Sequence, residues 1–227
     1  VRSTFEDKGA FLEVGPWSQP LLDSILASTG GMRDAVKEAL KNGRSGSLSS
    51  GLHHARKNSG NGFCQFNGLA LAALEALKKV KTVGILDLDA HAGGGTFDIL
   101  GDHKQVYLAD VTVNAFDSWE PSDPARHFYV AVDSPKDYLR HVEAALHSLE
   151  RVDFLIYNAG MDTYEKAGGM KGITKDIIRK REKLVVHWAR ARKIPHIFAL
   201  AGGYKWGGLT LEQVAELHLE TVKVFAA

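Results

Sequence analysis

Two kinds of apolar pattern alternate along the 227-residue chain. Short apolar runs rich in β-branched residues predict buried strands at 83–87, 105–109, 127–132, 153–157 and 196–200. Between these runs, apolar residues spaced three and four positions apart predict amphipathic helices over 66–79, 138–149, 175–192 and 211–225. Strands that alternate with helices form parallel βαβ units, so we expect an α/β fold with helices on both faces of a central, mostly parallel sheet.

Two segments rich in turn-forming residues are the strongest candidates for loops. Residues 43–51 are rich in glycine and serine, and residues 114–126 contain Trp119, Pro121 and Pro124. Neither segment is long enough to require a domain boundary, so we expect a single domain.

Composition and charge narrow the class of protein. The formal net charge of +1, from 28 basic and 27 acidic residues, gives no electrostatic footprint for nucleic acid or an acidic membrane. The single cysteine, Cys64, excludes an internal disulfide, and we expect it to be a buried small side chain rather than a nucleophile. No apolar run approaches the ~20 residues that span a bilayer, and residues 1–7 do not resemble a signal peptide. We therefore expect a cytoplasmic protein without membrane or nucleic-acid partners.

Chemically capable side chains follow the predicted strands at the position where open α/β sheets bind ligands. Asp87, Asp89 and His91 occupy alternate positions, so their side chains point to one face if the strand continues through them. Together with Asp162, which follows another predicted strand, Asp89 and His91 predict a catalytic divalent-metal site with one position open for water and substrate. The alternative is that these acids cap the following loop and that His91 is a solvated turn residue.

Two further segments carry residues suited to proton transfer and hydrogen bonding. The adjacent His53 and His54 could act as a general base and an electrostatic partner, or form a surface dipeptide without a role. In Gly202-Gly203-Tyr204, the glycines let the backbone approach a ligand, and the tyrosine hydroxyl could stabilise an oxyanion. The alternative there is a tight turn with a half-buried tyrosine. The run Gly93-Gly94-Gly95-Thr96 lacks the spacing and the lysine of a phosphate-binding loop.

These segments, in this order and spacing, resemble the histone deacetylase superfamily, and its class IV branch most. The resemblance rests on five blocks, which are Gly51-Leu52-His53-His54-Ala55, Gly62-Phe63-Cys64-Gln65-Phe66-Asn67, Asp87-Leu88-Asp89-Ala90-His91-Ala92-Gly93, Tyr157-Asn158-Ala159-Gly160-Met161-Asp162 and Gly202-Gly203-Tyr204. It extends from about Val14 to the C-terminus. It implies one deacetylase-like catalytic domain over residues 1–227 with the three-layer arginase–deacetylase fold. The implied reaction is metal-dependent hydrolysis of the amide that joins an acetyl or longer acyl group to a lysine-like amine.

The resemblance also implies which residues hold metal ions. Asp89, His91 and Asp162 would bind Zn²⁺, or Fe²⁺, which accepts the same ligands. A structural potassium ion is implied near Asp87 and Asp110.

The remaining roles concern the substrate. The resemblance implies that His53 and His54 flank the attacking water, with His54 as the general base and proton donor to the leaving amine. Asp87 would orient His53, and Tyr204 would donate a hydrogen bond to the oxyanion. The residues that would contact the substrate, an acylated lysine or acylated small amine, are Gly62, Phe63 and Gly203.

Departures from the family pattern lead to further expectations. Gly94 stands where many relatives carry an acid that pairs with the second histidine, which leaves the orientation of His54 open. The loop after Asp162 also differs from the family pattern. The segment before His53 is shorter than in relatives, so we expect a sheet one strand short, a more open rim and self-association through the uncovered edge.

Two alternatives to a deacylase stay open. A non-catalytic relative that acts as a binding or scaffold module would bind metal without turnover, and Gly94 and the short front motivate it. A nucleotide-binding oxidoreductase is motivated by the glycine run after a strand, although the glycine spacing is wrong for it.

Overall fold

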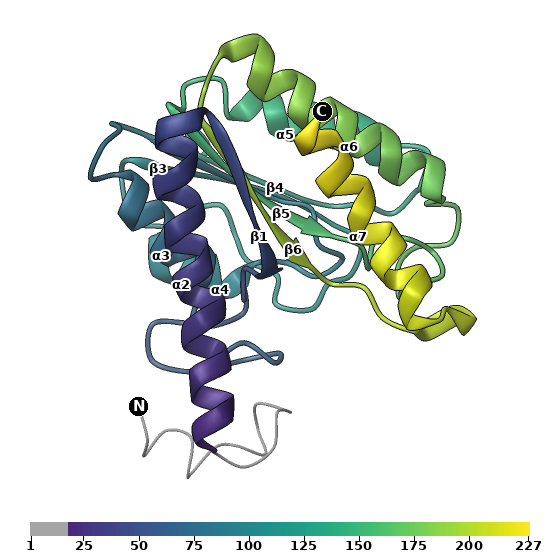
Figure 1. Cartoon of the computed structure of the whole chain (residues 1–227). Coiled ribbons are helices and arrows are strands. Elements are labelled where there is room, and N and C mark those ends of the chain that lie inside the picture. Colours follow the sequence, from purple (N-terminus) through teal and green to yellow (C-terminus); the bar gives the residue numbers. More distant parts are fainter. Residues whose placement is uncertain (1–17) are drawn as a thin grey trace.

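A six-stranded sheet forms the middle layer of the molecule, and every strand pairing in it is parallel (Figure 1). The computed structural model describes residues 18–227; the expectations that residues 1–17 hold no signal peptide and belong to the single domain lie outside this range. In chain order the strands are β1 (Arg44–Ser50), β2 (Val83–Asp87), β3 (Val106–Thr112), β4 (His127–Ala131), β5 (Phe154–Gly160) and β6 (His196–Ala201). In space their order is β1-β6-β5-β2-β3-β4, so the expected parallel sheet is confirmed.

Helices cover both faces of this sheet (Figure 1). One face carries α2 (Gln19–Asn42), α3 (Gly68–Ala76) and α4 (Gly94–Leu100), and the other carries α5 (Tyr138–Ser148), α6 (Lys175–Arg192) and α7 (Leu211–Ala226). A short 3-10 helix, η1 (Trp206–Gly208), precedes α7. None of the helices within residues 18–227 has the length and apolar content needed to cross a membrane. The expected three-layer α/β architecture is confirmed.

Two hydrophobic cores lie on either side of the sheet, because successive side chains of a strand point to opposite faces. In β2, Ile85 packs with the layer of α2, α3 and α4, whereas Leu86 packs with the layer of α5, α6 and α7. In β5, Ile156 and Tyr157 alternate in the same way. Burial on both faces explains why these strands are continuous apolar runs in the sequence.

The prediction of a loop at 43–51 was wrong, because β1 occupies this segment and pairs with β6. Serine and glycine have low strand propensity, so the amino-acid pattern carries no strand signal. Packing against the neighbouring strand explains the composition, since a Cβ on Gly46 would lie 2.1 Å from Cε1 of Phe198. Glycine therefore makes room for an aromatic ring of β6.

Two helices were not predicted from the sequence. α2 begins after Ser18, whose side chain caps the helix, and ends at Gly43, which has a φ of +84°. Gly30 and Gly31 lie near its centre, where they lower helix propensity and interrupt the apolar pattern. α4 begins at Gly94, inside the glycine run, so this run forms the start of a short helix.

Within residues 18–227, the strands β1 and β4 form the two edges of the sheet. Leu48 on β1 is 73% exposed. An edge strand with an exposed apolar side chain is a place where a second chain can pair. The expected self-association stays a prediction, and a monomeric mass in light scattering at micromolar concentration would contradict it.

A buried ion pair joins α6 to the carboxyl ends of β2 and β5. Arg181 and Glu182 are both fully buried, and Oε1 of Glu182 accepts hydrogen bonds from the guanidinium and from the Tyr157 hydroxyl. Nη1 of Arg181 donates to the backbone oxygens of Leu88 and Gly160, at 3.2 and 2.7 Å. Arg181 therefore fixes the two strand ends relative to each other.

We expect Glu182→Gln to lower the free energy of unfolding by about 3–5 kcal/mol, because it leaves the Arg181 charge buried without its partner. Urea denaturation followed by circular dichroism measures this change. The matched control is Glu216→Gln, whose side chain is 64% exposed and lies 3.9 Å from Nζ of Lys175. Its expected effect is below about 0.5 kcal/mol, and equal losses in the two variants would contradict the prediction.

Candidate metal and acid–base site

Three side chains from the ends of β2 and β5 converge on one point. The candidate ligand atoms of Asp89, His91 and Asp162 all lie within 4.8 Å of one another. Nδ1 of His91 is 3.3 Å from Oδ1 of Asp89 and 3.2 Å from Oδ2 of Asp162. In the sheet, Asp87 of β2 lies opposite Asn158 of β5, so the residues that follow these strands meet at the same edge. The structure thus brings together the three residues that the sequence suggested as metal ligands.

Two glycines allow these elements to approach so closely. A Cβ on Gly160 would lie 2.3 Å from Cα of Asp89, and a Cβ on Gly202 would lie 2.1 Å from Cγ of Asp162. A side chain at position 160 would therefore separate the strand ends that carry the two carboxylates, and one at position 202 would separate Asp162 from the turn after β6.

The turn after β6 also carries the other predicted residues, Gly203 and Tyr204. The Tyr204 ring stacks on Trp206 with ring centroids 4.8 Å apart, and its backbone N–H donates to the carbonyl of Ala167. Gly203 has a φ of +133°, and a Cβ there would lie 3.2 Å from Cβ of Met161. Both residues therefore lie in a turn that contacts the end of β5.

The electrostatics of the three-residue cluster fit a divalent cation. Hydrogen bonds with Asp162 and Asp89 raise the pKa of His91 to about 9, and burial together with Asp89 raises the pKa of Asp162 to about 6. Oδ2 of Asp162 is buried, and the donor that lies beside it, Nδ1 of His91 at 3.2 Å, is also 3.3 Å from Oδ1 of Asp89. Two buried carboxylates therefore share a single imidazole nitrogen. Two carboxylates and one imidazole nitrogen form a donor set that suits Zn²⁺ or Fe²⁺.

His53 lies between this cluster and a second carboxylate. Its Nδ1 donates to Oδ2 of Asp87 at 2.8 Å, and its Nε2 is 3.7 Å from Oδ1 of Asp89. Asp87 is held in turn by Nδ2 of Asn158, at 2.9 Å. Burial lowers the pKa of His53, but the two aspartates outweigh burial and hold this pKa well above its usual range. The His53 ring is therefore oriented by Asp87 and favours the charged form.

His54 has a different partner. Its Nδ1 donates to Oδ2 of Asp117 at 2.8 Å, and its ring lies 3.9 Å from the His53 ring, centroid to centroid. Burial and the neighbouring His53 lower the pKa of His54, against the opposing effect of Asp117. Adjacent histidines thus have pKa values shifted in opposite directions. The sequence left the orientation of His54 open, because glycine stands at position 94 where many relatives carry an acid. The hydrogen bond to Asp117 accounts for this orientation.

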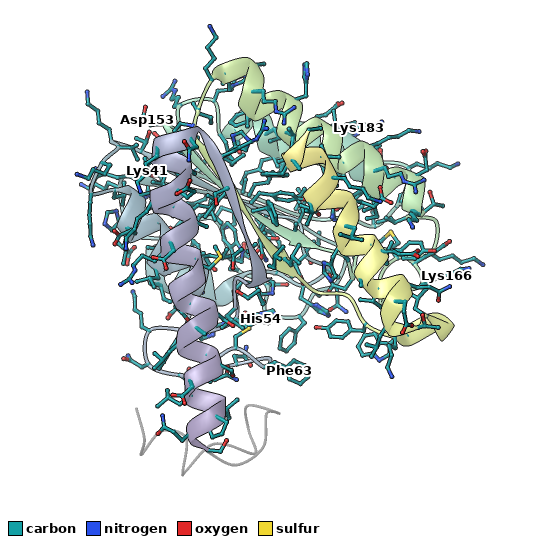
Figure 2. The ribbon with its side chains drawn as sticks, in the orientation of Figure 1. Lys41, His54, Phe63, Asp153, Lys166 and Lys183 are labelled. Carbon is teal, nitrogen blue, oxygen red and sulfur yellow. The ribbon has the colours of Figure 1, made fainter. Side chains whose placement is uncertain are left out.

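Apolar side chains surround the outer side of the histidine pair. Phe116 stands edge-on to His54 and to His91, with ring centroids 5.0 and 5.9 Å away. A Cβ on Gly62 would lie 2.7 Å from Cδ2 of His54 and 3.2 Å from Cε1 of Phe116. Phe63 and Phe116 are 50% and 46% exposed. Figure 2 shows His54 and Phe63 at the same end of the sheet, opposite to Lys41 and Asp153.

The turn that carries Phe63 is closed by backbone hydrogen bonds between Asn61 and Cys64. Phe63 has a φ of +64°, a left-handed conformation that is uncommon for a bulky residue, and its side chain is half-exposed. Cys64 is buried, and burial raises its pKa to about 11, so little thiolate exists at neutral pH. The expectation that Cys64 is a buried side chain is confirmed.

A second pair of carboxylates lies behind the histidines. Burial and the neighbouring Asp87 raise the pKa of Asp110 to about 8. Oδ2 of Asp110 accepts hydrogen bonds from Gly93 N–H and from the Trp119 indole, whereas its Oδ1 is buried without a partner among the described residues. A cavity of about 10 Å³ adjoins Asp87 and Asp110, enough for about one water-sized particle. The unpartnered oxygen of Asp110 is thus buried in a region that also contains this small cavity.

The chain matches known proteins over nearly its whole length. The family model described as the histone deacetylase domain matches residues 6–222. The chain belongs to the histone deacetylase family. The resemblance of the five sequence blocks to the histone deacetylase superfamily is therefore confirmed, and the likeness to its class IV branch stays a prediction.

Several relatives of this deacetylase-family chain are known. Histone deacetylase 2 of Arabidopsis thaliana is 31% identical in an alignment of length 201 that covers 82% of this chain and 51% of that protein. An acetylpolyamine amidohydrolase of Burkholderia pseudomallei is 25% identical in an alignment of length 169 that covers 67% of this chain and 48% of that protein. The chain thus spans about half the length of these two relatives.

A solved structure shares the fold of this deacetylase-family chain. The crystal structure of an acetylpolyamine aminohydrolase from Burkholderia pseudomallei matches with a TM-score of 0.68 at 22% identity. The match covers 90% of this chain and 60% of that one. The expected arginase–deacetylase fold is confirmed.

Two residues of this site were missed in the sequence. Phe116 and Asp117 both lie in the loop that follows β3, and they reach the histidines from there. The rule that ligands bind beyond the carboxyl ends of parallel strands applies to β3 as well as to β2, β5 and β6. Applied to every predicted strand, it would have drawn attention to residues 114–126.

Proposed function

We propose that this protein hydrolyses an acyl amide, releasing a carboxylate and a free amine from an acylated lysine or acylated small amine. The observation that carries the proposal is the convergence of Asp89, His91 and Asp162 beside the His53–His54 pair in a member of the histone deacetylase family. The names of two relatives, an acetylpolyamine amidohydrolase and a histone deacetylase, support acetylated amines as the substrate class.

The three-residue cluster is the proposed site of the catalytic metal, with zinc as the expected ion and ferrous iron as the alternative. A divalent ion held by Asp89, His91 and Asp162 would supply Lewis acidity toward the acyl carbonyl and the attacking water. Potassium is proposed at the second carboxylate pair, because Oδ1 of Asp110 is buried without a partner among the described residues and the cavity there adjoins Asp87.

The opposite pKa shifts of the two histidines suggest how they divide the work. His54, whose pKa is lowered, stays neutral near pH 7 and accepts a proton from the attacking water. The same proton then goes to the nitrogen of the leaving amine as the C–N bond breaks. His53, whose ring is oriented by Asp87, stabilises the negative charge that develops on the oxygen atoms of the reacting carbon. The Tyr204 hydroxyl donates a hydrogen bond to the carbonyl oxygen as it becomes an oxyanion.

The apolar rim supports an alkyl-chain substrate. Phe63 and Phe116 would pack against the methylene stem of an acylated lysine or polyamine, while Gly62 keeps the space beside His54 and Phe116 free of a side chain. Gly203 would let the backbone of the turn after β6 approach the acyl group.

Acetate release tests this function. The purified chain, loaded with Zn²⁺ or Fe²⁺ under anaerobic conditions, is incubated with an acetyl-lysine peptide and with N-acetylputrescine. Turnover of either substrate supports the proposal. A folded chain that binds metal and hydrolyses neither substrate would contradict it and would support the non-catalytic alternative.

Metal affinity is expected to rise steeply with pH. Without metal, His91 has a pKa of about 9 and carries a proton at pH 7, and a metal ligand must lose that proton. The apparent association constant for Zn²⁺ should rise about tenfold per pH unit between pH 6 and 9. Below the Asp162 pKa of about 6, a second proton is displaced, so the slope becomes steeper. Competition with a chromophoric chelator at several pH values measures this slope, and a pH-independent affinity would contradict the prediction.

A further inference from the structure

The loop between β3 and β4 sends one carboxylate inward to the histidine pair. Asp117 has a φ of +59°, a left-handed conformation that aspartate tolerates better than most residues. Its side chain is only 1% exposed. A buried carboxylate on an otherwise exposed loop is stable only when hydrogen-bond donors or cations pair with it, so the partners of Asp117 indicate its role.

Three groups hold this carboxylate in place. Oδ2 accepts hydrogen bonds from Nδ1 of His54 at 2.8 Å and from the backbone N–H of Gly95 at 3.2 Å. Oδ1 pairs with Nη2 of Arg56, whose Nη1 also donates to the carbonyl of Gly94 at 3.4 Å. Arg56 and the backbone of Gly95 therefore fix the Asp117 carboxylate from two sides, and the fixed carboxylate orients the His54 ring.

The space for Asp117 exists because residue 94 is glycine. A Cβ at this position would lie 2.4 Å from the backbone oxygen of Asp117 and 2.6 Å from its Oδ1. These separations are well below van der Waals contact, and one of the two atoms belongs to the backbone. The inward conformation of Asp117 therefore requires glycine at position 94.

We propose that Asp117 is a positioning residue that holds the proton of neutral His54 on Nδ1 and fixes the ring orientation, in a place that Gly94 keeps free. The carboxylate accepts only, so Nδ1 carries the proton and Nε2 keeps its lone pair for proton transfer. The opposite edge of the ring, at Cδ2, faces Gly62 and the apolar rim. The consequence for turnover rests on the proposed function, whereas the effect on the His54 tautomer does not.

Nitrogen NMR tests the tautomer without any substrate. The full chain is labelled with ¹⁵N-histidine, metal-free and zinc-loaded, and the His54 signals are assigned by their loss in His54→Gln. We expect the Nδ1–H tautomer in the unsubstituted chain, and a mixture or the Nε2–H tautomer in Asp117→Ala. An unchanged tautomer in Asp117→Ala would overturn the proposal, even if the protein hydrolyses no substrate.

Kinetics test the consequence for turnover. We expect kcat to fall by about 10- to 100-fold in Asp117→Asn, which keeps the side-chain volume and loses the charge, while KM changes less than about twofold. The control is Asp123→Asn, a carboxylate of the same loop that pairs with Arg126, and its kcat should be unchanged. Wild-type kcat in a folded Asp117→Asn would overturn the positioning role. If the unsubstituted chain itself shows no turnover, the proposed function fails and the NMR result still decides the inference.

A double-mutant cycle tests the link to residue 94. Gly94→Ala should displace the Asp117 side chain and therefore lower kcat as much as Asp117→Ala does. Because both substitutions remove the same contact, kcat in the double variant Gly94→Ala/Asp117→Ala should be little lower than in either single variant. The matched control is Gly30→Ala on α2, where a Cβ would meet nothing within 4 Å. Full activity in Gly94→Ala, or additive losses in the double variant, would overturn the requirement for glycine.

Discussion

Asp162→Asn is expected to abolish tight metal binding and, with it, acyl-amide hydrolysis. The substitution removes one of two buried carboxylates and replaces it with an amide of equal size, so the fold is kept and a charged ligand is lost. We expect kcat/KM to fall by more than about 10³-fold, since a catalytic metal supplies several kcal/mol of transition-state stabilisation. Elemental analysis after dialysis and acetate release measure the two effects on the same sample.

A carboxylate at the other end of β5 provides a matched control for Asp162→Asn. Asp153 lies just before β5 and accepts hydrogen bonds from the backbone N–H groups of Lys81 and Thr82, at the end of the sheet opposite to Asp162. Asp153→Asn should therefore bind metal and turn over substrate like the unsubstituted chain. Stoichiometric zinc in Asp162→Asn after dialysis would show that Asp162 is not a ligand.

Tyr204→Phe should lower kcat by about 10²- to 10³-fold, the cost of removing one donor to an oxyanion. Because the ring remains and can still stack on Trp206, substrate binding and metal content should change little. Steady-state kinetics with an acetyl-lysine substrate separate kcat from KM. The control is Tyr107→Phe on β3, near the opposite end of the sheet, which should keep full activity. If Tyr204→Phe raised KM and left kcat unchanged, the hydroxyl would act in binding rather than in catalysis.

The fold could be predicted where a strand is buried on both faces. β2 and β5 are continuous apolar runs because each face packs against a helical layer. β1 could not be recognised, because the Phe198 ring of its neighbour requires glycine at position 46 and thereby removes the strand signal. In α2, Gly30 and Gly31 interrupt the helical pattern, and tertiary packing stabilises the helix despite their low propensity.

The candidate site also has one part that the sequence predicts and another part that it does not. Asp89, His91 and Asp162 follow recognisable strands, so topology alone predicts that they meet, and their ligand atoms do converge within 4.8 Å. Their role as metal ligands stays a proposal. The contact between Asp117 and His54 joins residues 63 positions apart through a loop whose path depends on a left-handed residue and on the absence of a side chain at Gly94. No local pattern encodes such a contact.

The loop between β3 and β4 carries Phe116 and Asp117 as chain neighbours, one at the apolar rim and the other behind His54. A backbone change in residues 114–118 therefore moves both side chains at once. In the proposed enzyme, substitutions in this loop that change the contact with the methylene stem of the substrate amine would therefore also lower the turnover number. Phe63 lies in a separate, self-closed turn. Of the two rim residues Phe63 and Phe116, Phe63 is thus the one that can be replaced without moving Asp117. A mutant library for altered substrate preference should therefore begin at position 63.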